Sequence, residues 1–139
     1  MLAALLFSMI LPTFNPAELT AHLYIEEATT TPVVLLPILK PVCTCESGQG
    51  TGKPQQFNIE TGEVLRGVIN PKDIGLCQIN EYWNGEEAEE LGYDIYTESG
   101  NIQMANHLYK RSGLQPWNAS KGCWAKAVYN ATSTPQTGI

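Results

Sequence analysis

The residues that could do chemistry begin with a glutamate in an unusual place. Glu46 lies in "CTCESGQG", residues 43–50, just after the apolar stretch "VVLLPILK" at 33–40. Burial beside apolar groups and the negative end of a helix both disfavour a carboxylate charge, so both raise its pKa. A carboxylic acid that keeps its proton near neutral pH suits general acid catalysis. Glu46 is therefore a candidate proton donor, and the alternative is a glutamate that merely ends a surface helix.

The four cysteines are Cys43, Cys45, Cys77 and Cys123. Their C-x-C start lacks the C-x₂₋₄-C spacing and the second pair of a zinc site, and neither His22 nor His107 lies near any of them. We therefore expect no metal and no cofactor. An even number of cysteines beside a signal-like leader favours disulfides in an oxidising compartment, with buried thiols as the alternative. Spacing alone leaves three pairings open.

The first 32 residues are expected to be a signal-like leader and tether. Residues 2–11 are predominantly apolar, too few to span a membrane, which takes about 20 residues. Their length suits the core of a signal peptide, although no lysine or arginine precedes them. We expect a protein that is secreted or associated with the cell envelope, without a stable membrane span. A loosely docked leader is the alternative.

Composition indicates one globular domain, which we place at 33–130, followed by a flexible tail at 131–139. The chain has 139 residues, of which 43% are hydrophobic and 16% charged. Its net charge of −6 with only eight basic residues argues against nucleic acid as a partner, because nucleic-acid binders concentrate lysine and arginine. We expect a monomer.

Local patterns predict a mostly α fold with one short β-hairpin after the helix that carries Glu46. The predicted helices cover 39–47, 85–91, 100–112 and 121–129. Gly48, Gly92 and Gly113 are expected to end the first three, while Asn84 and Ser120 are expected to cap the second and fourth. The β-prone runs 55–59 and 63–69 flank "ETG" and predict the hairpin.

Four segments resemble a known fold when they are taken in order. They are "CESG", "IGLCQIN", "GNIQMANHLY" and "PWNAS" with a following "CW". Together they resemble the lysozyme-like fold of lytic transglycosylases and goose-type lysozymes over about residues 38–125. No segment is specific alone, and the order and spacing of all four carry the resemblance. It implies an α+β lysozyme-like domain.

The resemblance also implies roles for individual residues. Glu46 matches the catalytic glutamate, Ser47 the serine that follows it, and Gln78 a glutamine that lines the substrate cleft. Tyr109 matches an aromatic hydroxyl that faces the glutamate, and Asn101 the asparagine that opens the later helix. We expect these four residues beside Glu46, together with Asp73, to bind the substrate. From the residues alone, Gln78 could instead bond a loop backbone and Tyr109 could be a core residue.

The chain departs from the family in two places. Cys77 stands where the family usually has methionine, and an Ala-Tyr-Asn-Ala-Gly stretch is missing. Of the three tryptophans, Trp83, Trp117 and Trp124, any could stack on a sugar, but we expect at least two to pack in the core.

A second carboxylate is the usual partner of a glycosidase acid. Glu60, Glu63 and Asp73 are the candidates, and Asp73 leads directly into the Gln78 segment through "NPKDIG". The alternative for Asp73 is an aspartate that caps a turn. Lytic transglycosylases need only one carboxylate, which protonates the leaving oxygen and then helps a muramic acid 6-hydroxyl to close an anhydro ring.

The resemblance thus implies an exported enzyme that cleaves the MurNAc–GlcNAc bond of peptidoglycan glycan strands. Whether the product is an anhydro sugar or a hydrolysed end stays open. The alternatives are a glycan-binding or cell-wall structural module of the same fold without turnover, and a goose-type hydrolase of chitin-like polymers.

Similarity to the related resuscitation-promoting factors, which share "CESGG"-like sequence, implies one disulfide. In them a cysteine before the glutamate pairs with one near the end of the domain, which corresponds here to Cys45–Cys123. Cys43 and Cys77 then form a second bridge or stay as buried thiols. Because Cys43 and Cys45 point to different sides of a helix, separate partners for them are feasible.

Overall fold

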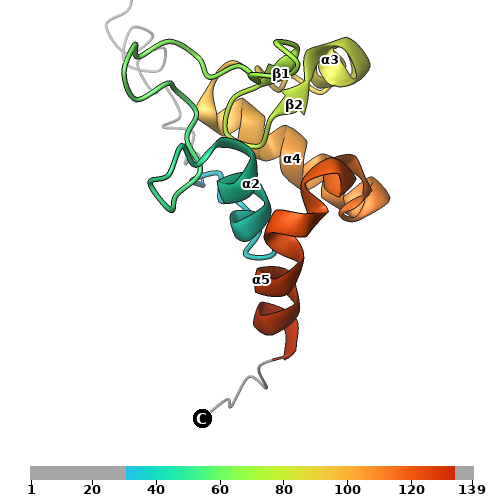
Figure 1. The fold of residues 1–139 in the computed structure, drawn as a ribbon. Helices are drawn as coiled ribbons and strands as arrows, with labels where there is room; N and C mark the ends of the chain where they lie inside the picture. The colour runs from blue at the N-terminus through green and yellow to red at the C-terminus, as the bar shows by residue number, and fades with distance from the viewer. Residues whose placement is uncertain (1–30, 134–139) are drawn as a thin grey trace, which may run out of the picture. The chain divides into compact units, whose positions relative to one another are not determined.

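The computed structural model describes residues 31–133. Nearly all of them belong to Pro32–Ile139, the second of two units into which the chain divides. The described residues are mostly helical with one short antiparallel hairpin, as predicted (Figure 1). The predicted leader and tether lie almost entirely outside the described residues, as does most of the predicted tail.

The elements follow one another as α2 (Leu39–Ser47), β1 (Asp73–Ile74), β2 (Ile79–Asn80), α3 (Glu81–Glu90), α4 (Glu98–Ser112), the 3₁₀ helix η1 (Gln115–Ser120) and α5 (Lys121–Ser133). Helix α2 packs against α5 and η1, and α4 packs against η1 and β2. Within this unit, Figure 1 shows β1, β2 and α3 at one end and α5 at the other, with α2 and α4 between them.

Helix α2 forms where the sequence predicts it. Pro41 lies in its first turn, where the missing N–H has no intrahelical partner to lose. Gly48 ends the helix and donates its backbone N–H to the Thr44 carbonyl at 2.9 Å. Leu39 and Val42 are buried against the core, which fixes the face that α2 turns inward.

The strands lie later in the chain than predicted. The runs 55–59 and 63–69 meet in one isolated bridge, Phe57↔Val64, while the hairpin pairs Asp73 with Asn80 and Ile74 with Ile79. The reason is burial. The isoleucines of β1 and β2 lie in the core, whereas most apolar residues of the earlier runs face solvent and have no second layer to cover them.

Helix α3 begins four residues earlier than the expected start at 85. Its N-cap is Asn80 rather than Asn84, and the Asn80 side chain accepts a hydrogen bond from the Trp83 backbone N–H at 3.2 Å. Asn80 is extended because it ends β2, so it can cap the helix that follows directly. Helix α5 extends to Ser133, beyond the expected end at 129.

The two disulfides join α2 to segments far away in the sequence. Cys45 bonds Cys123 of α5, which confirms the pairing implied by the resemblance. Cys43 bonds Cys77. Of the two alternatives for this pair, the structure therefore contains the second disulfide and not two buried thiols. Among residues 31–133 no free cysteine remains, and no helix combines the length and the apolar character needed to cross a bilayer.

We predict that the two disulfides differ in their reactivity with reductants. Cys43 and Cys77 are both 0% exposed, whereas Cys123 is exposed and Cys45 half-buried. Exchange requires access of a thiolate to sulfur, so mild dithiothreitol should open Cys45–Cys123 first. Alkylation followed by peptide mapping measures the order, and simultaneous labelling of all four cysteines would contradict the prediction.

Replacing Cys45 and Cys123 together by serine should lower the free energy of unfolding by about 4 kcal/mol, because the bridge closes a long loop. The sequence separation is 78 residues. Urea denaturation measures the loss. An unchanged free energy of unfolding would show that this bridge adds nothing to stability.

Candidate active site

A pocket of about 280 Å³ lies beside the last turn of α2. Its lining residues are Glu46, Asp73, Gln78, Ile79, Asn80, Trp83, Asn84, Leu108, Pro116, Trp117 and Ala119. Three of them, Glu46, Asp73 and Gln78, are site residues that the sequence predicts. The fold therefore gathers two carboxylates and an amide from α2, β1 and the turn before β2 into one concave surface.

The Glu46 carboxyl is partly buried, and its pKa is raised above the ordinary value for glutamate. Burial is the main cause, since it penalises the charged form. A hydrogen bond from the Ser120 hydroxyl favours the charged form and lowers the pKa in part, whereas the negative charge of Asp73 raises it again. Because the net effect is a raised pKa, the protonated fraction of the Glu46 carboxyl near neutral pH is larger than that of an exposed glutamate.

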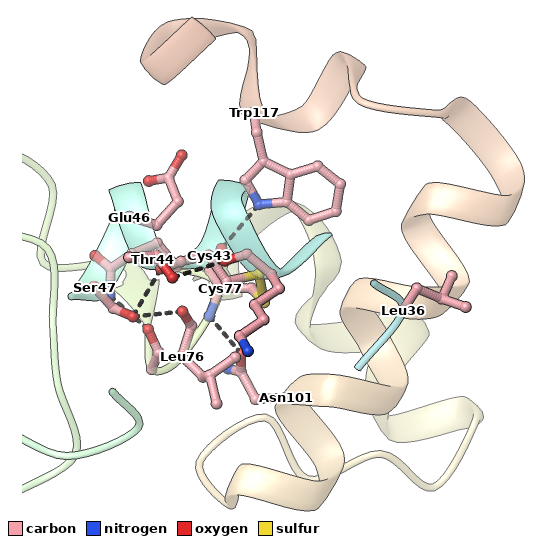
Figure 2. The surroundings of a disulfide bond; sticks show 12 residues. Leu36, Cys43, Thr44, Glu46, Ser47, Leu76, Cys77, Asn101 and Trp117 are labelled. Atoms are coloured by element: carbon pink, nitrogen blue, oxygen red, sulfur yellow. Dashed lines mark hydrogen bonds between the residues drawn. A yellow bond between two sulfur atoms is a disulfide. The ribbon is translucent and has the colours of Figure 1, made fainter. Parts of the chain in front are cut away.

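Adjacent residues of α2 serve different purposes. Figure 2 shows the Glu46 side chain pointing away from the Cys43–Cys77 bridge, while the Ser47 side chain turns toward Leu76. Ser47 is buried, its hydroxyl lies 3.0 and 2.6 Å from the carbonyl oxygens of Cys43 and Leu76, and it accepts from the Gln55 N–H. Ser47 thus holds backbone in place and cannot make the substrate contact that the resemblance implies.

Asn101 also lies away from the pocket. It is 0% exposed, its Oδ1 accepts from the Cys77 N–H, and its Nδ2 donates to the carbonyls of Ile74 and Ile95, all at 2.9 Å. This side chain fixes the segment between β1 and β2, which carries one wall of the pocket. Its role is to position the site, and the expected substrate contact is not compatible with its burial.

Asp73 lies in the pocket and is held by two amides. Its Oδ1 accepts hydrogen bonds from Asn80 Nδ2 at 2.6 Å and from Asn70 Nδ2 at 3.2 Å. These bonds leave Oδ2 without a side-chain partner in the described part of the chain. Asp73 therefore combines the turn contact that its position in "NPKD" suggests with a place in the pocket that Glu46 also lines.

Gln78 lines the pocket with a backbone conformation that is unusual for a residue with a side chain. Its φ is 50°, a left-handed value that costs energy and is found disproportionately at functional sites. Its Nε2 also donates to the Gly75 carbonyl at 2.9 Å, so the loop contact and the pocket position are both present. Gly67 lies beside this side chain, and a Cβ there would lie only 2.5 Å from the Asn70 carbonyl oxygen.

Tyr109 does not line the pocket that contains Glu46. The residue of α4 that does so is its neighbour Leu108. Tyr109 is half-buried and packs against the core, and among the described residues no hydrogen bond joins it to Glu46. The structure therefore places Tyr109 against the core and not facing Glu46.

Only one of the three tryptophans is available to a ligand. Trp117 and Trp124 are buried, and their Nε1 groups donate to backbone carbonyls of Cys77 and Trp117, respectively. Trp83 is 77% exposed and lines the pocket, with the Tyr82 ring against it edge to face at 4.6 Å. The sequence could not separate these three, because their burial depends on tertiary packing.

Two site residues carry no sequence signal for the roles that they have. Ser120 is expected to cap the last helix, but it ends η1, which runs directly into α5, and its hydroxyl donates to Glu46 Oε1. Asn80 both caps α3 and holds Asp73. A hydroxyl or an amide is compatible with many partners, so residue type alone does not reveal these contacts.

A larger pocket of about 630 Å³ lies between α3 and residues 92–96. Its Glu81 carboxylate pairs with Lys72 at 2.8 Å and accepts from the Tyr96 hydroxyl. These contacts lower the Glu81 pKa, so Glu81 stays ionised and is a poor proton donor. The smaller pocket is therefore the better candidate for acid catalysis, since it holds the carboxyl whose pKa is raised.

Comparison with protein-family models, with characterised proteins and with solved structures yields no match to the chain. Within residues 31–133, no group of three or more His, Cys, Asp or Glu side chains is arranged to hold a metal ion.

The raised pKa of Glu46 predicts how stability changes with pH. A folded-state pKa above the unfolded value stabilises the protein at low pH, and this contribution is lost as pH rises through the folded pKa. Glu46→Gln removes the titration and keeps an acceptor for Ser120. The variant should therefore gain thermal stability relative to the wild type as pH rises from 4 to 8.

Thermal midpoints of both proteins across that pH range measure the difference, and Glu63→Gln, at an exposed position, is the matched control. A stability difference between Glu46→Gln and the wild type that stays constant, or that shifts in favour of the wild type, from pH 4 to 8 would contradict the assignment of an unfavourably buried charge.

Proposed function

We propose that this protein is an exported enzyme that cleaves the glycosidic bond between N-acetylmuramic acid and N-acetylglucosamine in peptidoglycan. The observation that carries the proposal is the Glu46 carboxyl, whose pKa is raised in a pocket that also contains Asp73. The four segments that resemble lytic transglycosylases supply the reaction type and the substrate class.

In this proposal Glu46 acts first as an acid and then as a base. Its protonated carboxyl donates the proton to the glycosidic oxygen as the bond to the anomeric carbon breaks. The resulting carboxylate then takes a proton either from water, which gives a reducing end, or from the muramic acid 6-hydroxyl, which gives an anhydro ring. Asp73 contributes negative charge that favours the positively charged, oxocarbenium-like transition state.

The remaining walls of the pocket suit a sugar. Trp83 offers an exposed aromatic surface to the apolar face of a pyranose ring. Gln78 and Asn84 provide amides for sugar hydroxyl and acetamido groups. The chemistry is acid–base chemistry carried out by side chains and calls for no cofactor.

The disulfides support an extracytoplasmic location for this activity. Two bridges within about 80 residues of chain are typical of proteins that fold in oxidising compartments. Peptidoglycan lies in such a compartment, outside the cytoplasmic membrane. Export also agrees with the signal-like character of residues 2–11 in the sequence.

The decisive experiment is incubation of the purified protein with peptidoglycan sacculi. Release of soluble muropeptides supports the enzyme, and mass spectrometry of the products distinguishes anhydro ends from reducing ends. Binding to sacculi without release would favour the glycan-binding module instead. Chitin oligosaccharides form a parallel arm, and cleavage of these alone would move the proposal to a chitin-like substrate.

We predict that Glu46→Gln lowers the rate of muropeptide release by roughly 10²- to 10⁴-fold, the usual contribution of general acid catalysis. An amide of nearly the same shape cannot donate the proton. Glu60, another candidate for the second carboxylate, is exposed and does not line the pocket, so Glu60→Gln is the matched control and should keep wild-type activity. Near-wild-type release by Glu46→Gln would remove the central assignment.

The pH dependence of the rate is a separate prediction. Activity should fall as pH rises through the raised pKa of Glu46, because only the protonated carboxyl is the acid. Asp73→Asn removes a negative charge that raises this pKa, so the alkaline limb of its residual activity should move to lower pH. Rate profiles from pH 4 to 9 measure both, and a wild-type rate that still climbs at alkaline pH would point to a different catalytic group.

A further inference from the structure

The contacts of Ser120 connect Glu46 to the buried side of η1 and α5. The Ser120 hydroxyl lies within hydrogen-bond distance of two acceptors, Glu46 Oε1 and, at 3.1 Å, the carbonyl oxygen of Trp117. It also accepts from Trp124 Nε1 at 3.0 Å. Trp124 is almost fully buried, so this indole is a fixed partner rather than a solvent-exposed one.

The Ser120 hydroxyl has fewer protons to donate than it has acceptors nearby. A serine hydroxyl has one proton to donate and two lone pairs to accept with. Trp124 Nε1 lies 3.0 Å from both Ser120 Oγ and the Trp117 carbonyl oxygen, so its single N–H occupies at most one lone pair of Ser120. This leaves the one Ser120 proton for two acceptors and at least one lone pair free. The single proton must therefore point either to the Glu46 carboxylate or to the Trp117 carbonyl.

These two orientations match the two states of an acid–base catalyst. When Glu46 is ionised, the Ser120 proton points to Oε1. When Glu46 is protonated at Oε1, the carboxyl donates to a free lone pair of Ser120 until a glycosidic oxygen accepts that proton, and the Ser120 proton turns to the Trp117 carbonyl. Rotation of one hydroxyl then satisfies both states, and no heavy atom needs to move.

We infer that Ser120 is a positioning residue that keeps Glu46 hydrogen-bonded at the same oxygen in both its acid and its base form. The catalytic part of this inference rests on the proposed function. A group that must give up and regain a proton within one reaction cycle gains from a partner that serves both forms, because reorganisation of the site between steps is avoided.

No positively charged side chain pairs with Glu46 in the described part of the chain, so Ser120 is its side-chain hydrogen-bonding partner. Asp73 of β1 acts on Glu46 by repulsion. The sequence of η1, "QPWNAS", has no ionisable side chain, and Lys40 lies on α2 itself. From α5, Lys121 and Lys126 form no ion pair with Glu46 in the described part of the chain.

The two orientations are not equal in strength. A hydrogen bond to a charged carboxylate is stronger than one between neutral groups, so Ser120 favours the ionised form, in agreement with its lowering effect on the Glu46 pKa. Removing the hydroxyl should therefore raise that pKa further, while a merely structural serine would leave it unchanged.

The experiment is a carbon-13 NMR titration of the Glu46 carboxyl in the wild type, Ser120→Ala and Ser120→Thr, with Glu46→Gln used to assign the resonance. Ser133→Ala is the control, because Ser133 lies on α5, the helix that follows Ser120 directly, and its hydroxyl donates to a backbone carbonyl, that of Tyr129. We expect the Glu46 titration to move to higher pH in Ser120→Ala only. Restoration by Ser120→Thr would tie the effect to the hydroxyl.

Activity on sacculi gives the second readout. The alkaline limb of kcat should move in Ser120→Ala in the same direction as the NMR titration, with a loss of roughly tenfold or more in the plateau kcat, the size expected for a hydrogen bond to a charged group. An unchanged Glu46 titration in folded Ser120→Ala overturns the inference. A shifted titration in a protein without any activity on sacculi overturns the proposed function instead, and leaves Ser120 as the partner of Glu46.

Discussion

The structure depends on how the backbone of residues 74–77 is held between β1 and β2. This segment is buried, and its strands are only two residues long, so the sheet cannot satisfy its peptide groups. Side chains do so instead. Leu76 N–H donates to Gln56, and Leu76 O accepts from Ser47. An unpaired buried peptide group costs about 1–3 kcal/mol, so each of these side chains is important to the fold.

Cys77 is the point where these contacts converge. Its sulfur bonds Cys43 of α2, its N–H donates to Asn101 of α4, and its carbonyl accepts from Trp117 of η1 (Figure 2). One buried residue thereby fixes three helical elements relative to the turn that carries Gln78. The cysteine at this position adds a covalent bond to the packing of the buried segment.

The same arrangement explains why Glu46 can be partly buried and still reach the pocket. Bridges at Cys43 and Cys45 hold two sides of α2, and the remaining side carries Glu46 between β1 and η1. Rigid support on either side keeps the carboxyl close to Asp73 and Ser120. The unfavourable placement of a carboxylate is maintained because the rest of the helix is fixed by covalent bonds and by core packing.

Much of the fold was accessible from local sequence. Pro41 and Gly48 delimit α2 and Gly113 ends α4, because these signals act within a few residues. The hairpin was misplaced because 55–59 and 63–69 have the composition of strands, and only burial by other segments decides which β-prone run becomes one. The start of α3 was missed for a related reason, since Asn80 and Asn84 are equally good caps until β2 places Asn80 in an extended conformation.

The sequence by itself determined the identity of the candidate acid, the Cys45–Cys123 pairing through resemblance, and a mostly helical domain. Only the tertiary structure decided which polar residues serve the pocket and which serve the backbone. Ser47 and Asn101 are turned inward, Tyr109 packs in the core, and Ser120 reaches Glu46 from 74 residues away in the chain. The physical reason is that a polar side chain takes whichever partner the fold brings within 3 Å or so of it, and residue type constrains only the kind of partner.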